Sequence, residues 1–419
     1  MRMPAGYRRG FALVVTPGQP PQWAELGMEP DVLARQIEAL RHDLDPVHAG
    51  ARGRTRPPDT LGDTEYGAKG YDRARARALY DALFGAPQIA AALKGKTKWI
   101  VVPQGELLSL PLAALVTGDY PGGKAGDADP AALRSTPWLG VERTLSVLPT
   151  VSSLALLREG QGIAAAPVSP GNRLFGIGEP RLSDAAGDAM GPVNEETSVW
   201  HDGHADRNAI LSLPQIDPPA LRRIAQALRM PDENLLIGPE ATEARLRAAA
   251  DQLAAANIVI FNTHGLIASN QPGALAEPAL VLMPPLAGMA GSSENDGLLT
   301  ASEAAALRLS ANWVVLSACN TAAGDGTAEG LSGLARAFFV AGARGLLVSQ
   351  WRVQTEAAAA LIPDTIAMAV GQGHSRAQAL QRAMIALMQR TDRDDIGRSF
   401  AHPASWAVFE FVGADNNGS

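Results

Sequence analysis

The chain has 419 residues, more than one ordinary domain of about 100–200 residues, which predicts two or three domains or one large α/β unit with an added front region. Its 46% apolar and 19% charged residues suit a soluble globular protein with a sizeable core. A net charge of −7 without a long basic run argues against sequence-independent nucleic-acid binding, and no apolar stretch approaches the roughly 20 residues of a membrane span.

The N-terminus and the cysteine content bear on location and cofactors. Arg8 and Arg9 precede an apolar run of only residues 11–15, which is shorter than the roughly 7–15 residues of a signal-peptide core. We therefore expect a cytoplasmic protein. The one cysteine, Cys319, excludes an intrachain disulfide and a Cys-rich zinc site, and we expect neither a metal nor a cofactor.

The front half predicts a few strands and helices separated by polar stretches rich in Gly and Pro. We expect strands at 11–16, around 23–26, at 99–102 (buried) and at 174–178, and helices at 32–44 and 76–83. We interpret residues 45–70, 118–129, 160–172 and 183–208 as loops.

The back half alternates short apolar strands with helices. Strands are expected at 258–261, 279–283, 313–316 and 345–349, and helices at 242–255, 302–307, 331–341, 356–370 and 375–388. Continuous apolar strands of four or five residues that alternate with helices indicate a parallel sheet covered on both faces.

Two motifs suggest ligands but lack the context that those ligands need. Residues 118–124 have the G-x-x-x-x-G-K spacing of a phosphate-binding loop, yet Pro121 interrupts them and Ala125 stands where a hydroxyl should hold magnesium. His201 and His204 are potential metal ligands in a polar Gly-rich stretch without a helix to hold their rings. We interpret both as solvated loops.

Two strand ends carry the chemistry. Residues 258–261 lead into Asn262-Thr263-His264-Gly265, and residues 313–316 lead into Ser317-Ala318-Cys319. In an open parallel sheet, ligands bind beyond the carboxyl ends of the strands, so an imidazole and a thiol would emerge side by side if these strands are neighbours. A nearby histidine activates a thiol whose ordinary pKa is about 8.5.

The same segments offer an oxyanion hole, formed by the backbone N–H groups of Gly265 and Cys319. The competing interpretation is a buried structural cysteine and a hydrogen-bonded loop histidine, which is the usual state of a free cysteine. The matched positions of the two residues favour a reactive His264–Cys319 pair.

At these residues the sequence resembles the CHAT family of caspase-like cysteine peptidases, which are often attached to tetratricopeptide repeats. The His motif of that family, A-T-H-G, corresponds to residues 262–265 with Asn262 in place of Ala, and its L-S-A-C-x-T motif is matched in full at 316–321. Further similarity at 329–338, 349–353, 402–413 and the front half extends the resemblance from about residue 11 to 413.

The resemblance implies a caspase-like three-layer α/β sandwich with a mostly parallel sheet, preceded by a smaller pseudo-caspase or supporting α/β region. We expect an N-terminal strand–helix region and loop at 1–70, a supporting half at 71–230 and a catalytic half at 231–419. It also implies peptide-bond hydrolysis, with Cys319 as nucleophile and His264 as base and then acid, and a role in bacterial defence. No tandem repeat with a period of 20–50 residues is found in these 419 residues, so we do not expect the usual repeat array in this sequence.

The preferred P1 residue stays open at this point. The run Ser349-Gln350-Trp351-Arg352 is similar to the segment with which caspases build their S1 and S2 pockets, so Trp351 and Arg352 are candidates to bind an acidic P1 residue. Asp296, Asp325 and Glu329 are the alternatives for a basic P1 residue, although each also fits an ordinary loop or helix-terminal acid.

The sequence is compatible with three functions. The leading one is a cysteine endopeptidase that acts on a protein substrate and is held inactive until a partner protein or a cleavage orders residues 269–297 and 321–329. The others are a catalytically silent caspase-like scaffold and a thiol amidohydrolase acting on a small molecule. An open groove would favour the peptidase and a deep closed pocket the amidohydrolase.

Overall fold

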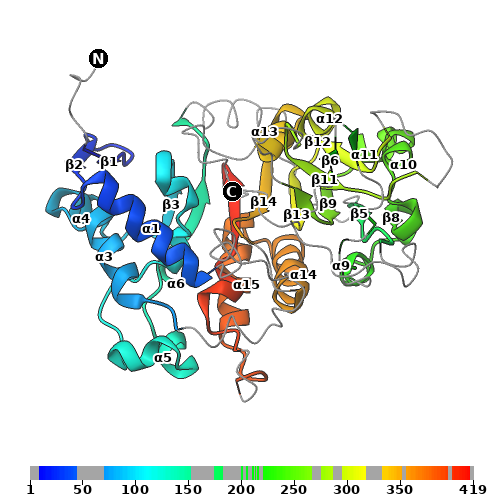
Figure 1. Cartoon of the computed structure of the whole chain (residues 1–419). Coiled ribbons are helices and arrows are strands. Elements are labelled where there is room, and N and C mark those ends of the chain that lie inside the picture. The colour runs from blue at the N-terminus through cyan, green and yellow to red at the C-terminus, as the bar shows by residue number, and fades with distance from the viewer. Residues whose placement is uncertain are drawn as a thin grey trace.

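The structure is a computed structural model that describes residues 9–44, 70–151, 174–182, 200–201, 204–205, 210–211, 213, 215–216, 220–266, 275–285, 295–317, 333–351, 355–394 and 399–415. Eight strands of this described chain form one sheet, in the order β3–β4–β15–β14–β13–β9–β5–β8 (Figure 1). Their bounds are β3 Lys98–Val101, β4 Thr144–Val147, β5 Leu174–Gly178, β8 Leu235–Ile237, β9 Ile258–Asn262, β13 Trp313–Ser317, β14 Gly345–Ser349 and β15 Phe409–Gly413.

The sheet contains two blocks of parallel strands that run in opposite directions. β14 and β15 pair antiparallel, whereas every other neighbouring pair is parallel. Strands β14, β13, β9, β5 and β8 therefore all end at one edge, which we call the carboxyl edge and which Gly178, Asn262, Ser317 and Ser349 mark. The residues that follow these four strands emerge at the same edge, where ligands bind in sheets of this kind.

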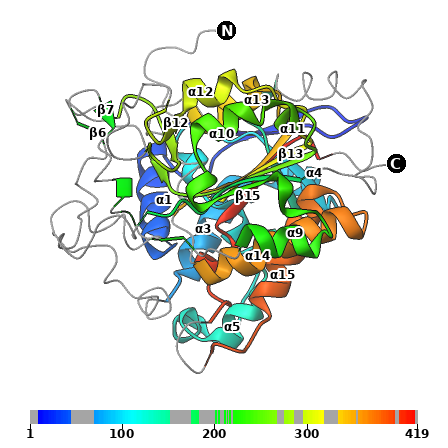
Figure 2. The same ribbon diagram turned by 90° about the vertical axis from the view of Figure 1, so that its right-hand side faces the viewer.

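Helices cover both faces of the sheet (Figure 2). On one face lie α9 Ala220–Ala227, α14 Thr355–Gly371 and α15 Arg376–Met388, and on the other lie α10 Glu243–Ala248, α11 Ala250–Ala254, α12 Ala301–Ala306 and α13 Gly333–Val340. The expected fold class, a three-layer α/β sandwich with a mostly parallel sheet and helices on both faces, is confirmed.

Alternate side chains of the central strands supply the two cores. In β13, Trp313 and Val315 belong to one buried cluster, whereas Val314 and Leu316 belong to the cluster on the opposite face. Burial on both faces explains why residues 313–316 are continuously apolar, because all four side chains are buried.

The front region packs beside this sheet and contributes the strands β3 and β4 to it. Figure 1 shows its helices and the β1–β2 hairpin on the left, next to β3. Its elements, together with the short helix α16, are β1 Phe11–Val14, β2 Gln22–Glu25, α1 Pro30–Leu44, α3 Arg73–Phe84, α4 Pro87–Leu93, α5 Pro130–Arg134, α6 Leu139–Glu142, α16 Pro403–Trp406 and the 3₁₀ turns Gly105–Ser109, Leu112–Ala114 and Gly123–Asp127. Two further 3₁₀ turns flank β8, at Asp232–Asn234 and Gly238–Glu240, and Ala249 separates α10 from α11.

Two small sheets complete the described chain. The strands β10 Gly265–Leu266, β11 Ala279–Val281 and β12 Leu298–Thr300 form an antiparallel sheet at the carboxyl edge, and β6 Trp200–His201 pairs with β7 His204–Ala205. Within the large sheet, β5 from the 71–230 segment lies between β9 and β8 from the 231–419 segment. The expected division of the chain into three regions, with boundaries at residues 70 and 230, stays a prediction.

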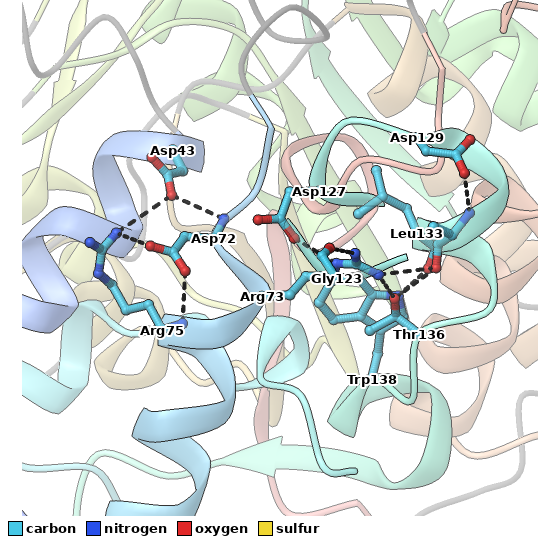
Figure 3. Close-up of polar contacts among 11 residues, drawn as sticks. Asp43, Asp72, Arg73, Arg75, Gly123, Asp127, Asp129, Leu133, Thr136 and Trp138 are labelled. Carbon is cyan, nitrogen blue, oxygen red and sulfur yellow. Dashed lines mark hydrogen bonds and ion pairs between the residues drawn. The ribbon is translucent and has the colours of Figure 1, made fainter. Parts of the chain in front are cut away.

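A buried arginine organises the loop that carries the phosphate-loop spacing (Figure 3). Arg73 has no exposed surface, and its guanidinium donates to Asp127 Oδ1 at 2.8 Å, Thr136 Oγ1 at 3.0 Å and the Gly123 carbonyl at 2.7 Å. A Cβ atom at Gly126 would lie 2.4 Å from the guanidinium, so this position needs glycine. The loop that contains this motif therefore binds a cation of the protein itself, through the Gly123 carbonyl and the Asp127 carboxylate.

Most predicted elements are confirmed, and the differences have physical causes. The strand at 99–102 is at the edge of the sheet, so only Trp99 is buried and the expectation of a buried strand was wrong. The loop expected at 118–129 includes the 3₁₀ turn around Arg73. Strand β4 escaped prediction because Thr144 and Ser146 interrupt its apolar residues, although both are buried.

Candidate active site

The register of two neighbouring strands brings the histidine and cysteine motifs to the same level. β9 and β13 pair in parallel from Ile258 opposite Trp313 to Asn262 opposite Ser317. In the sequence, His264 follows Asn262 by two residues and Cys319 follows Ser317 by two residues. His264 is partly exposed at this edge, and Cys319 lies outside the described residues.

Hydrogen bonds on three sides hold the backbone that leads into His264. The Asn262 carbonyl accepts from Glu179 N–H at 2.8 Å, and the next N–H, that of Thr263, donates to the Ser317 carbonyl at 3.2 Å. The His264 carbonyl then accepts from Val281 N–H at 2.9 Å. This segment is therefore tied to β5, β13 and β11 at once, which limits the positions that the imidazole can take.

The candidate oxyanion donor Gly265 lies in β10, opposite Leu280 of β11. The preceding residue pair, His264 and Val281, is hydrogen-bonded, because the Val281 N–H donates to the His264 carbonyl. Hydrogen-bonded and non-hydrogen-bonded pairs alternate in an antiparallel ladder, so the Gly265 N–H is directed away from β11. An N–H group in that orientation is able to donate to a substrate oxygen.

Among the candidate P1-binding acids, Asp296 is the one that the structure describes. Its Oδ1 accepts from Leu298 N–H at 2.9 Å at the start of β12, and burial raises the pKa of its carboxyl. Glu303 adds to this rise, and Glu243, whose side chain is almost fully buried, lies near both acids. Across the described residues, no group of three or more His, Cys, Asp or Glu is arranged to hold a metal ion.

The run that resembles the caspase S1–S2 segment is buried where it is described. Trp351 has no exposed surface; its Nε1 donates to the Ala404 carbonyl at 3.3 Å, and the Arg41 guanidinium lies 5.9 Å from its ring centroid. Gln350 donates through Nε2 to the carboxylate of Glu410, whose pKa burial raises to about 7. Three candidates of the sequence analysis, Arg352, Asp325 and Glu329, lie outside the described residues.

One acidic residue at the carboxyl edge was missed by the sequence analysis. Glu179 directly follows β5, is 2% exposed and accepts through Oε1 from Asn262 Nδ2 at 3.1 Å. The signal was present, because Glu179 follows an apolar strand just as the His264 and Cys319 motifs do. Polar residues therefore follow three neighbouring strands, β5, β9 and β13, at the carboxyl edge.

A parallel block whose strand ends carry histidine and cysteine motifs defines the caspase-like class of α/β cysteine-peptidase folds. The model of the CHAT domain matches residues 73–414, and the chain belongs to the CHAT-domain family. This match extends over the front region as well as the back half.

Two curated relatives share a short part of the chain. Tetratricopeptide repeat protein 28 of Mus musculus is 36% identical over 118 residues, and the Homo sapiens protein of that name is 33% identical over 118 residues. Each match includes 28% of this chain, and the chain spans 4% of the length of these relatives.

Solved structures offer distant likenesses. The pro- and mature domains of RgpB from Porphyromonas gingivalis match with a TM-score of 0.40 and 11% identity, over 79% of this chain and 70% of that one. The separase–securin complex of Saccharomyces cerevisiae matches with a TM-score of 0.35 and 11% identity, over 66% of this chain and 14% of that one. None of these likenesses bears on activity. No helix in the described part of the chain is long and apolar enough to cross a membrane.

Proposed function

We propose that this chain is a cysteine endopeptidase that cleaves a protein substrate with a His264–Cys319 dyad. The observation that carries the proposal is the register of β9 and β13, in which Asn262 lies opposite Ser317 and the Thr263 N–H donates to the Ser317 carbonyl. His264 and Cys319 each follow this residue pair by two positions in the sequence. The imidazole and the thiol are therefore expected within reach of each other.

The proposed reaction has two halves. His264 removes the thiol proton as Sγ of Cys319 attacks the scissile carbonyl carbon, and the N–H groups of Gly265 and Cys319 stabilise the oxyanion. When the C–N bond breaks, the imidazolium gives its proton to the leaving amine and a thioester remains. His264 then removes a proton from water, which attacks the thioester and releases the acid and the free thiol.

The P1 residue is read either by Arg352 or by one of the acids Asp296, Asp325 and Glu329. Trp351, which has no exposed surface, would support the Arg352 segment without touching the substrate. A peptide library that varies P1 separates the two versions, because Arg352 favours an acidic P1 and the acids favour a basic one. Replacing each candidate by its neutral counterpart then identifies the residue. Cleavage without any charge preference at P1 would remove both versions.

Control by a partner protein or by a cleavage is part of the proposal, as are a cytoplasmic location and a role in bacterial defence; these rest on the sequence features and the family. We propose that the control blocks substrate binding in the uncut chain, while the His264–Cys319 dyad is already assembled there. The isolated, uncut chain should then hydrolyse peptides slowly and gain activity after limited proteolysis. Full activity of the uncut chain would refute this control.

The first test measures the rate at which iodoacetamide alkylates Cys319 as a function of pH. The signal has one source, because the chain has one cysteine. We expect fast alkylation with an apparent thiol pKa below the ordinary value near 8.5, lost in His264→Ala. Peptide hydrolysis should fall by about 10²–10⁴-fold in His264→Ala and be abolished in Cys319→Ala.

A thiol as slow as a free cysteine and indifferent to His264→Ala would overturn the dyad and favour the silent scaffold. A coupled dyad that hydrolyses small amides but no protein would favour the thiol amidohydrolase instead.

A further inference from the structure

Glu179 occupies the junction of four elements at the carboxyl edge. Its Oε1 accepts from the Asn262 side chain of β9 at 3.1 Å and from the Leu221 N–H in the first turn of α9 at 2.8 Å. Its N–H donates to the Asn262 carbonyl at 2.8 Å, and its carbonyl accepts from Gly238 N–H, just after β8, at 3.1 Å. The side chain and backbone of Glu179 thus both engage Asn262.

The backbone at Glu179 is strained. Its φ angle is +52°, in the left-handed region that non-glycine residues rarely adopt and that costs roughly 1–2 kcal/mol. The preceding residue, Gly178, approaches β9 so closely that a Cβ atom there would lie 2.1 Å from the Asn262 carbonyl oxygen. Residues in such backbone regions cluster at functional sites, where the surrounding structure maintains the strain.

The hydrogen bond from the Glu179 N–H to the Asn262 carbonyl acts on the peptide group one residue before His264. The peptide group that joins Asn262 to Thr263 accepts from Glu179 on one side and donates to Ser317, the last residue of β13, on the other. Its orientation therefore depends on both neighbours, and it precedes His264 by one residue. Asn262 is also where this chain departs from the A-T-H-G motif, and its side chain is the group that reaches Glu179.

We propose that Glu179 is a positioning residue for the catalytic histidine: it fixes the Asn262–Thr263 peptide and thereby the place of the imidazole relative to the β13 strand end. The inference rests on the proposed function. Cys–His sites generally use a third group to orient the base. Here that group acts through Asn262 of the histidine strand, because the Glu179 carboxylate binds the Asn262 side chain and the Glu179 N–H binds the Asn262 carbonyl.

The experiment compares apparent thiol pKa values from the pH dependence of Cys319 alkylation by iodoacetamide in the full chain. Glu179→Ala removes the Oε1 atom that accepts from Asn262 and Leu221, and we expect the apparent thiol pKa to rise toward 8.5 and the rate at pH 7 to fall about tenfold. Glu179→Gln keeps an Oε1 acceptor and should restore the wild-type profile. Asn262→Ala removes only the side-chain bond and should shift the profile in the same direction by less.

A variant in a remote buried network controls for loss of stability. Asp127→Ala removes a partner of Arg73 and should lower the melting temperature without moving the thiol pKa. If Glu179→Ala fails to fold, Asn262→Ala carries the test, because it keeps the Glu179 N–H bond to the Asn262 carbonyl.

The outcomes separate the inference from the proposed function. A wild-type dyad that is lost in His264→Ala but unchanged in Glu179→Ala and Asn262→Ala, with only a lower melting temperature, assigns Glu179 a structural role and overturns the inference alone. A wild-type thiol that does not depend on His264 overturns the proposed function, and the inference with it.

Discussion

Arg73 and Glu179 are both buried charged residues, but they are held in different ways. Arg73 is 0% exposed and Glu179 is 2% exposed, and each binds segments distant in the chain. Arg73 lies in the regular first turn of α3, and its guanidinium donates to Gly123, Asp127 and Thr136. Glu179 has a strained backbone, follows a strand of the carboxyl edge and binds the strand that leads into His264.

The difference shows which features point to chemistry. Burial of a charge alone is a structural device at Arg73, where a salt bridge and hydrogen bonds offset the cost of removing the guanidinium from water. At Glu179, burial coincides with backbone strain and with the carboxyl edge. Strain together with position at a strand end distinguishes a candidate site from a well-satisfied core.

We expect the largest loss of stability when the hydrogen bonds and the salt bridge of Arg73 are removed. Arg73→Met leaves Asp127, whose side chain is 16% exposed, without its cation, and we expect the free energy of unfolding to fall by about 3–5 kcal/mol. Urea denaturation measures this loss. The alkylation profile of Cys319 should not change in the folded variant, because the network lies outside the carboxyl edge.

A control variant on the same helix separates burial from charge. Arg77 pairs with Asp81 at the surface, and Arg77→Met should cost less than about 1 kcal/mol. Equal losses for Arg73→Met and Arg77→Met, or a shifted thiol pKa in Arg73→Met, would contradict the comparison.

A third buried charged residue, Glu243, should make the stability of the chain depend on pH. Burial raises the pKa of this carboxyl from 4.5 to about 8, opposed by the Gly297 N–H bond and reinforced by Glu303 and Asp296, while Arg247 acts against the rise. The folded chain therefore binds a proton that the unfolded chain releases above pH 4.5. Stability should fall as the pH rises from about 5 to 8, by a few kcal/mol.

The test is the melting temperature between pH 5 and 8 in the wild type and in Glu243→Gln, which stays neutral and keeps an acceptor for Gly297. The variant should lose most of the pH dependence. Much of what remains should come from Glu410, whose pKa of about 7 has the same sign of effect, and the pH dependence should fall further in the double variant with Glu410→Gln. Undiminished pH dependence in the double variant would exclude both groups as its source.

The smallest expected effect concerns Trp351. Trp351→Phe removes the hydrogen bond from Nε1 to the Ala404 carbonyl, and the free energy of unfolding should fall by about 1 kcal/mol. Trp23→Phe is the matched control, since Trp23 is 61% exposed and should cost under about 0.5 kcal/mol. A KM for peptide substrate that is unchanged in Trp351→Phe would remove this residue from the substrate-binding candidates.

The sequence by itself determined the sandwich and the histidine strand. Four- and five-residue apolar runs that alternate with helices have few stable arrangements other than a parallel sheet between helices, and β5, β9, β13 and β14 all appear where that rule puts them. The position of His264 after β9 follows from the same local pattern.

Only the tertiary structure decided the neighbours of these elements. The order β5–β9–β13, the antiparallel junction at β15 and the rung that joins Asn262 to Ser317 depend on pairings between residues far apart in the chain. The buried environments of Arg73, Glu179 and Trp351 also depend on such contacts. Local periodicity fixes which face of an element is apolar, whereas the partners that satisfy a buried charge come from distant segments that folding brings together.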